Sequence, residues 1–599
     1  MAFLNVFFVK SVSMRAKNPF LKGIMFILGI TAAALLPLFF IPEPQGKVGT
    51  KVIGKSVNLS EVKFLPGKRG GTLYEAVSSD PKTFNLVMAH ETSSTEAVGE
   101  LFEGLTEIDL KTLKPVGALA ESWEFKEGGL KWIFHLRKGV KWFDGVEFTA
   151  DDVVFTYNDI YFNPKIPNST KDSFLIDGKL PKVKKIDNYT VEFDLPAPFA
   201  PLLYSLSAPI FPKHVVEKAV KKGKFERFWN NSTPPKKLIG TGPYILVKYV
   251  PGQYLIYRRN PFYWKKDEQG QRLPYVEKKI KFIVPDKNTQ LLKFKAGEID
   301  FYGIRGDDYP ELKKGKGDYT IYNLGPSLTA DFICFNQKKD VLPDWKWKLF
   351  SDRRFRWAIS HAVDREGIVL TVYNGLGFPI YSPVTPANKL YYDPSYPKFP
   401  YNLKEARKLL SEIGLKDRNG DGWLETPDGH KVEFNLLTNS NNPARVQIGA
   451  ILKNDLKKLG IDVHFQPLDF NNLVEKLLHT HDFDAVIIGL TGSIDPNGGR
   501  NVWMSSGQLH MWNPNQKKPA TEWEAEVDRL FEEAAKTLDF EKRVKLYKKA
   551  YRIIAYQQPL IYIAAPLVLE AVRNRVKNYY PTVWGTYQPE RIFITPSQE

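Results

Sequence analysis

Cysteine is nearly absent from this sequence, because Cys334 is the single cysteine among 599 residues. A disulfide bond within the chain is therefore excluded. Cys334 lies in an apolar, strand-like run at residues 332–335, and no activating base is identifiable beside it. We therefore expect a buried structural thiol rather than a nucleophile.

Catalytic signatures are missing as well. The sequence contains no G-x-S-x-G motif, no H-E-x-x-H motif and no assignable catalytic triad. An enzyme is therefore not expected.

Signatures of nucleic-acid binding are also missing, although the formal net charge is +17. Ten lysines and arginines and only two acidic residues fall within residues 1–72, and the charge of the remainder is mixed. No recognition-helix pattern, zinc-ligand spacing or arginine-rich arm accompanies it, so nucleic acid is not an expected partner. The apolar fraction of 43% is typical of a globular protein. At 599 residues, two or three domains are expected.

One long uncharged run is present, at residues 23–41, and residues 1–22 before it are basic. At the helical rise per residue it would reach about 30 Å, enough to cross a bilayer core. The basic flank predicts a cytoplasmic N-terminus and an exported body. A cleaved signal peptide and a retained membrane anchor both fit, and the small residues 32–34 lie inside the run, which favours the anchor. Residues 42–70 are rich in Pro, Gly, Lys and Ser and predict a spacer.

Regular patterns follow in the body of the chain. Apolar residues alternate over 130–136, which predicts a strand, and Thr149 with Asp152 predicts a helix start. Residues 354–377 predict one helix with an apolar face. Residues 432–490 read as β-α-β-α-β, ending in a continuous apolar run. Such a run is typical of a strand buried on both faces, so this part predicts an α/β sandwich.

A short acidic loop offers a metal-binding hypothesis. Asp417, Asn419 and Asp421 occupy positions 1, 3 and 5 of a run with glycine at position 6, and Asp428 occupies position 12. This spacing resembles a calcium loop, although Asp replaces the usual Glu at position 12. A plain Asn/Asp/Gly turn satisfies the same residues. A structural calcium ion is therefore one hypothesis, and no other cofactor is expected.

Several ordered runs resemble a known family: residues 101–105 (LFEGL), 118–123 (ALAESW), 134–140 (FHLRKGV) and 149–153 (TADDV). They are similar to the family 5 extracellular solute-binding proteins of ABC transporters, which capture oligopeptides, dipeptides, nickel complexes or oligosaccharides. The resemblance covers nearly everything from residue 71 onward. It implies an α/β, two-lobed periplasmic-binding-protein-like fold (type II) with a small inserted domain.

The implied domains can be given by range. Lobe I comprises residues 71–110, 238–325 and 570–599, the inserted domain comprises 111–237, and lobe II comprises 326–569.

The ligand is expected between the lobes. Ligands of open α/β sheets bind beyond the carboxyl ends of strands, which singles out the loop at residues 491–499. In the family this loop carries an aspartate that pairs with a peptide's amino group. Here Leu490 replaces a tryptophan and Ser493 stands where that aspartate belongs, while Asp495 remains nearby. The expected ligand-binding residues are Glu91, Thr92, Ser93, Phe470, Ser493, Asp495 and Trp503.

The resemblance implies a monomeric, non-catalytic receptor in the periplasm or another extracytoplasmic space, which hands its ligand to ABC permease subunits. A small peptide is the favoured ligand. The departure at Ser493 keeps an oligosaccharide or a nickel chelate as alternatives. A membrane-anchored hydrolase is a remote alternative. Residues 23–41 would attach the receptor to the cytoplasmic membrane if they are retained.

Overall fold

Two four-stranded sheets form the first half of the computed structural model, which describes residues 53–89 and 91–596. The sheet of lobe I has the order β1-β10-β9-β8, with β1 parallel to β10 and the other pairs antiparallel. Its strands are β1 (Thr72–Val77), β8 (Tyr244–Val250), β9 (Tyr254–Arg259) and β10 (Lys278–Ile283). Short pairs β19–β22 and β20–β21 end the chain: β19 (Val576–Lys577), β20 (Pro581–Thr582), β21 (Gly585–Thr586) and β22 (Phe593–Ile594).

The second sheet lies in the inserted range and has the order β4-β5-β7-β6. Its strands are β4 (Ala120–Lys126), β5 (Lys131–Leu136), β6 (Lys182–Asp187) and β7 (Thr190–Asp194). The predicted strand at 130–136 is β5, and both hydrogen bonds of the predicted capping box between Thr149 and Asp152 are present. The domain boundary expected at 110/111 falls in the turn of the hairpin β2 (Thr106–Asp109)–β3 (Lys114–Gly117).

Lobe I and the inserted range share one hydrophobic core. Leu101 and Leu255 from lobe I belong to the same buried cluster as Phe134 and Trp229 from the inserted range. One glycine allows this close packing. A Cβ on Gly104 of lobe I would lie 2.5 Å from the Ser207 carbonyl carbon of the inserted range, so only glycine fits there.

A third sheet runs from lobe I into lobe II, in the order β11-β18-β13-β17-β15-β16, with β12 and β14 also paired to β18. The strands are β11 (Phe301–Ile304), β12 (Tyr319–Pro326), β13 (Thr329–Phe335), β14 (Gly377–Pro379), β15 (Glu433–Asn439), β16 (Asp462–Leu468), β17 (Ala485–Thr491) and β18 (Leu560–Arg573). Along β17, Ala485 and Ile487 enter one apolar cluster while Val486 and Ile488 enter another. The predicted burial of this strand on both faces is thus confirmed, as is the buried Cys334 on β13.

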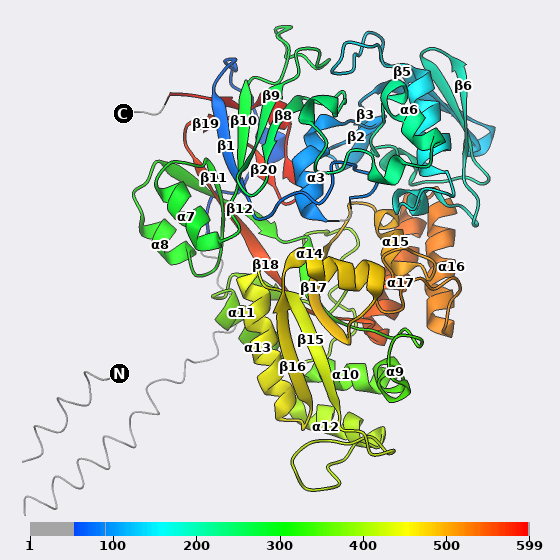
Figure 1. The fold of residues 1–599 in the computed structure, drawn as a ribbon, viewed down its shortest axis with the longest axis vertical. Helices are drawn as coiled ribbons and strands as arrows, with labels where there is room; N and C mark the ends of the chain where they lie inside the picture. Colours follow the sequence, from blue (N-terminus) through cyan, green and yellow to red (C-terminus); the bar gives the residue numbers. More distant parts are fainter. Residues whose placement is uncertain (1–52, 90, 597–599) are drawn as a thin grey trace, which may run out of the picture. The chain divides into compact units, whose positions relative to one another are not determined.

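Helices cover both faces of this sheet, as Figure 1 shows. The helices of lobe II are α9 (Asp344–Ser351), α10 (Arg353–Ala362), α11 (Arg365–Val372), α12 (Leu403–Glu412), α13 (Pro443–Lys457), α14 (Phe470–Glu475), α15 (Arg500–Trp503), α16 (Glu522–Lys536) and α17 (Phe540–Gln557). The others are α3 (Thr92–Val98), α4 (Ala150–Phe155), α5 (Leu202–Ser205), α6 (Lys213–Lys221), α7 (Lys287–Lys295) and α8 (Tyr309–Lys314).

The single helix predicted at 354–377 is wrong. The structure has α10 and α11 there, followed by β14. Asp364 is the N-cap residue of the second helix: its backbone is not helical, and its side chain accepts the Gly367 N–H at 2.9 Å.

The strand β18 links the two lobes. Its first half pairs with β13 and β14 of lobe II, and its second half pairs with β11 and β12 of lobe I. Figure 1 shows β18 passing from one group of elements to the other. The chain also crosses between β12 and β13, at Ser327 and Leu328. Two neighbouring strand connections therefore join lobe I to lobe II.

Candidate functional site

The candidate site is the junction between the lobes, where several pockets follow one another. A pocket of about 320 Å³ has serines of lobe I on one side and the first turn of α13 on the other; we call it the Ser93 pocket. It is lined by Ser78, Ser79, Thr92, Ser93, Glu96, Lys287, Arg305, Asn439, Asn441, Asn442, Pro443, Ala444 and Phe470. Thr92 and Ser93 on α3 thus face Phe470 on α14, as a ligand-binding cleft requires.

Glu91 is not among the residues that line the Ser93 pocket, unlike Thr92 and Ser93. It is 7% exposed, stands at the N-cap position of α3 and accepts a hydrogen bond from the Ser94 hydroxyl. Thr92 and Ser93 follow in the first turn of the helix, and both line the pocket.

A cluster of buried charged side chains on β10 holds α3 in position. Lys281 on β10 donates to the Glu96 carbonyl at 2.9 Å, and Lys279 and Lys281 both bond to the Glu100 carboxylate, at 2.6 and 3.2 Å. Burial alone would raise the pKa of Glu100, but the two ammonium groups outweigh it and lower the pKa to about 2. The cluster therefore fixes the helix that presents Ser93.

The loop after β17 lines two further pockets. One of these pockets lies inside lobe II, and the other lies against the inserted domain. Ser493 and Asn501 line both pockets. We call the first, of about 200 Å³, the Trp503 pocket, and the second, of about 390 Å³, the Tyr204 pocket. In this loop the Ser493 hydroxyl donates to the Asp495 carbonyl at 2.6 Å, which fixes the turn.

Asp495 is already engaged within the protein. It is 5% exposed, its Oδ1 accepts the Asn497 N–H at 3.0 Å, and its Oδ2 forms an ion pair with Arg543 of α17. Its carboxylate therefore holds the loop against α17. Trp503 also lines the Trp503 pocket, and its ring packs against Trp512 and Tyr551.

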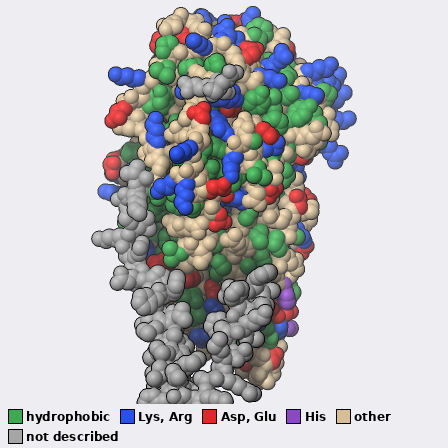
Figure 2. All heavy atoms as spheres, turned by 90° about the vertical axis from the view of Figure 1, so that its left-hand side faces the viewer, with side chains coloured by type: hydrophobic (Ala, Val, Ile, Leu, Met, Phe, Trp, Pro, Cys, Tyr) green, Lys and Arg blue, Asp and Glu red, His purple; other side chains and the backbone are tan. Residues whose placement is uncertain are grey.

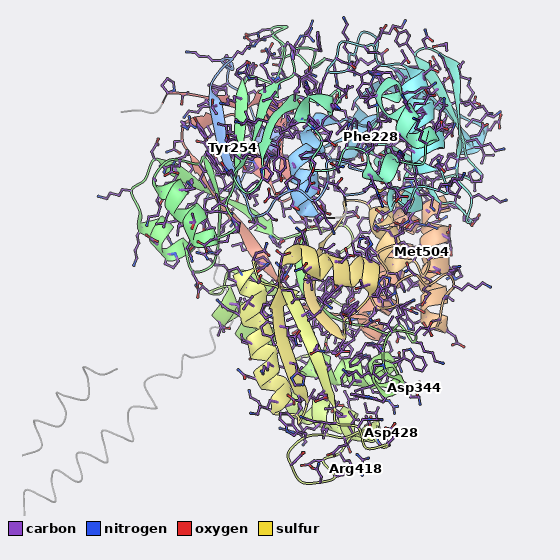
Figure 3. The ribbon with its side chains drawn as sticks, viewed as in Figure 1. Phe228, Tyr254, Asp344, Arg418, Asp428 and Met504 are labelled. Carbon is purple, nitrogen blue, oxygen red and sulfur yellow. The ribbon has the colours of Figure 1, made fainter. Side chains whose placement is uncertain are left out.

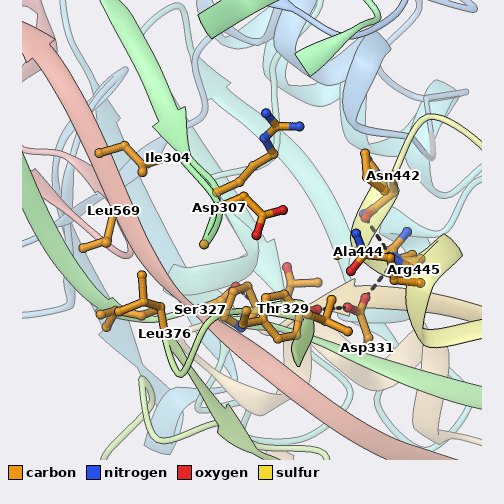
Figure 4. Close-up of a pocket in the computed structure, with 18 residues that line it drawn as sticks. Ile304, Asp307, Ser327, Thr329, Asp331, Leu376, Asn442, Ala444, Arg445 and Leu569 are labelled. Atoms are coloured by element: carbon orange, nitrogen blue, oxygen red, sulfur yellow. Dashed lines mark hydrogen bonds and ion pairs between the residues drawn. The ribbon is translucent and has the colours of Figure 1, made fainter. Parts of the chain in front are cut away.

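A fourth pocket, of about 260 Å³, lies where the lobes are joined; we call it the hinge pocket. Figure 4 shows Asp331 and Arg445 facing each other on one side of this pocket. Ile304 and Leu569 lie on the opposite side. Asp331 accepts from Arg445 Nε at 2.8 Å and from the Tyr373 hydroxyl at 2.7 Å. Burial, followed by the Asp331 charge, raises the pKa of Tyr373 well above its usual value, so its hydroxyl remains a donor.

The inserted domain contacts lobe II directly beside the Tyr204 pocket. Lys536 of α16 pairs with Asp177 at 2.6 Å, and the Asn497 side-chain amide donates to the Ser173 carbonyl at 3.0 Å. The Ala200 N–H also donates to the Ala535 carbonyl at 2.9 Å. These contacts close one end of the junction.

Sequence reasoning missed Lys287, Arg305, Asp331, Arg445 and Tyr204. A signal existed for Lys287, since a lysine directly after the N-cap residue Asp286 opposes the helix dipole. The others come from elements whose proximity only the folded sheet establishes.

The acidic loop at 417–428 lies far from the junction. Figure 3 shows Arg418 and Asp428 beyond α12, at the opposite end of lobe II from Met504. Carboxylate oxygens of Asp417, Asp421 and Glu425 converge, but Asp428 instead accepts from the Thr426 hydroxyl at 2.6 Å. Both oxygens of Asp417 already accept N–H groups, from Gly420 and Gly422. Calcium here stays a prediction.

A second group of converging ligands lies on the strands β15 and β16. Its members are Glu433, Asp462 and His464. The Lys431 ammonium already bonds to Asp462 at 2.5 Å, so a cationic group of the protein fills that space.

The expected anchor at residues 23–41 lies outside the described residues. Among residues 53–89 and 91–596, no helix is long and apolar enough to cross a membrane. Figure 2 shows lysine and arginine side chains spread over one face with acidic and apolar side chains between them.

Comparison with known proteins identifies the family. The profile of the bacterial extracellular solute-binding proteins, family 5 Middle, matches residues 114–510. A probable ABC transporter-binding protein of Deinococcus radiodurans is 31% identical over 541 residues, covering 85% of this chain and 89% of that protein. The oligopeptide-binding protein AppA of Bacillus subtilis is 31% identical over 548 residues, covering 90% and 93%.

Structural comparison agrees. The structure of AppA in complex with a nonapeptide has a TM-score of 0.76 at 30% identity and covers 89% of this chain and 100% of that chain. Among the sequence relatives, a periplasmic alpha-galactoside-binding protein of Rhizobium meliloti is 27% identical over 484 residues, covering 73% of this chain and 68% of that protein. The two-lobed α/β fold expected from the sequence is confirmed. The chain therefore belongs to the bacterial extracellular solute-binding proteins, family 5.

Proposed function

We propose that this protein is an extracytoplasmic receptor that captures a peptide between its lobes and delivers it to the permease of an ABC importer. The observation that carries the proposal is the pair of pockets at the junction, where α3 of lobe I and the inserted domain face the loops after β15 and β17 of lobe II. AppA, named an oligopeptide-binding protein and solved with a nonapeptide, supports a peptide. Binding would shift the population toward closed lobes without a catalytic step.

An oligosaccharide is a second candidate, favoured by the Trp503 pocket. Four aromatic residues line it, together with the neutral side chains of Asn388 and Asn501: they are Tyr391, Trp503, Tyr551 and Tyr562. Aromatic faces with neutral hydrogen-bonding groups suit a sugar. The alpha-galactoside-binding relative supports the same class.

Thermal unfolding with defined ligands separates the two candidates. A ligand that binds only the folded protein raises the midpoint according to its concentration relative to Kd. We expect a shift with a mixed pool of free peptides and none with cello-, xylo- or α-galacto-oligosaccharides. The reverse result would replace the peptide with a sugar. Mass spectrometry of the peptides after incubation checks that they remain intact, and their cleavage would contradict a non-catalytic receptor.

We further propose that the receptor is a monomer, held at the cytoplasmic membrane by residues 23–41 or released after their removal. The basic residues before this run support export of the body. Membrane fractionation and the intact mass of the native protein test attachment and cleavage, and light scattering on the purified body tests the monomer.

A further inference from the structure

The Ser93 pocket contains hydrogen-bond donors that the protein does not use. Ser93 is 9% exposed, and its Oγ has no hydrogen-bond partner among the residues that the structure describes. A buried hydroxyl without a partner is unfavourable in a folded protein. Because Ser93 lines the pocket, a bound group would satisfy it.

Lys287 brings a positive charge to the same pocket. Its ammonium donates to Gln290 Oε1 at 2.9 Å, and no ion pair of the described residues involves it. Lys287 opens α7, where the helix dipole opposes a cation, and burial lowers the pKa of this lysine. The Glu96 charge offsets only part of this effect, because the pKa of Lys287 remains lowered, and a ligand carboxylate would supply further counter-charge.

The opposite wall is the N-terminus of the fifteen-residue helix α13. The Asn442 side chain accepts the Arg445 N–H at 3.1 Å, and Pro443 has no N–H. Ala444 therefore carries the backbone donor of the first turn that remains for a ligand. Helix N-termini favour anions through these donors and through the dipole.

Two further charges line the pocket and determine its preference. Arg305 is held by Asp308 through two bonds, at 2.6 and 2.7 Å, so its charge is largely balanced. Glu96 also lines the pocket, and its exposed carboxylate attracts the Lys287 ammonium. A bound carboxylate would therefore share Lys287 with Glu96, and Lys287 is the cation of the lining that forms no ion pair among the described residues.

We propose that the Ser93 pocket binds the carboxylate end of the captured solute, with Lys287 as its counter-ion and with Ser93 and Ala444 as donors. This inference rests on the proposed function and narrows it, since it selects solutes that end in a carboxylate. Phe470, also in the lining, would pack against the adjacent apolar part of the solute.

The test compares two pools of random tripeptides that have the same sequences, one with free C-terminal carboxylates and one with C-terminal amides. The purified protein is equilibrated with both pools together, and the retained peptides are counted by mass spectrometry. We expect the free acids to be retained about tenfold more than the amides, because a charged hydrogen-bonded pair is lost with the amide.

Variants assign the preference to the pocket. Lys287→Gln is expected to bring the acid-to-amide ratio close to one, Lys287→Arg to keep it, and Ser93→Ala to lower it severalfold. Lys293→Gln is the matched control, because Lys293 lies on the same helix but pairs with Glu298. The melting midpoint of each variant confirms folding.

Each contrary result has its own meaning. Equal retention of acids and amides by the wild type overturns the carboxylate site and leaves the peptide receptor standing. A wild-type ratio in both Lys287→Gln and Ser93→Ala overturns the residue assignment. Retention of neither pool overturns the peptide function and the carboxylate site with it.

Discussion

Replacing Glu100 by glutamine should destabilise lobe I and loosen α3. Glu100 bonds to Lys279 and Lys281, whose side chains keep only 9% and 8% of their surface exposed. The variant would leave two buried ammonium groups with Glu75 as the remaining carboxylate nearby, at 4.0 and 3.6 Å. Uncompensated buried charges are strongly destabilising.

The magnitude follows from the pKa of Glu100. Relative to its ordinary value of 4.5, a folded pKa of about 2 corresponds to about 3 kcal/mol. Because the Glu100 side chain keeps 32% of its surface exposed, solvent screening reduces this to about 2 kcal/mol. The depressed pKa means that this stability is present above pH 4.5 and is lost as the pH falls toward 2.

The assay is urea unfolding at pH 7 and at pH 3, followed by circular dichroism. Glu100→Gln should lower the free energy of unfolding of the lobe I transition by about 2 kcal/mol at pH 7 and by less at pH 3. Glu298→Gln is the control, because its pair with Lys293 is exposed. If Glu100→Gln unfolds at the wild-type urea concentration at pH 7, the buried cluster does not stabilise the lobe.

Three further predictions concern other sites. Arg543→Met should lower the free energy of unfolding by about 3 kcal/mol and weaken ligand binding, because Asp495 loses its buried partner; calorimetry with and without ligand checks both. Burial raises the pKa of Glu103 to about 7, so Glu103→Gln should be more stable than the wild type above pH 7 and equal to it below pH 4.5, by urea unfolding. The calcium hypothesis for residues 417–428 predicts a melting midpoint that rises with added calcium and falls on chelation, and a midpoint unchanged by both would contradict it.

The α/β part of lobe II could be predicted because its pattern is local. The run at the end of 432–490 is apolar at every position, and each alternate residue of β17 meets a different helical layer. The boundary within 354–377 was missed for a local reason too. Asp364 can extend a helix or begin a new one, and only its hydrogen bond to Gly367 decides.

The alternation in β10 misleads where the partner is distant. Its sequence, KKIKFI, suggests that Ile280 and Phe282 point inward, yet the buried residues are Lys279, Lys281 and Ile283. Burial of lysine is tolerated because Glu100 meets both ammonium groups from another element. No spacing in the sequence reports such a long-range pair.

The same limit applies to the candidate site. Thr92, Ser93 and Phe470 could be chosen from the sequence because the family resemblance places them on the cleft, and the structure brings them to one pocket. The ion pair between Asp495 and Arg543 could not be predicted from the sequence, because Arg543 lies on the distant helix α17. The position of Lys287 at the start of a helix was unusual for a cation, but the sequence did not show which residues it would meet.

Weak closing contacts explain how a ligand can control the lobes. Near the Tyr204 pocket, Lys536 and Asp177 are 35% and 52% exposed, and such exposed pairs contribute at most about 1 kcal/mol. The covalent links, at β12–β13 and β18, lie beside one another in one sheet, so they permit a hinge motion. The Asn497–Ser173 and Ala200–Ala535 hydrogen bonds also favour closure, and a solute that contacts both lobes shifts the balance further toward the closed form. The Ser93 pocket supplies such contacts, because Lys287 and Ser93 belong to lobe I and Ala444 belongs to lobe II.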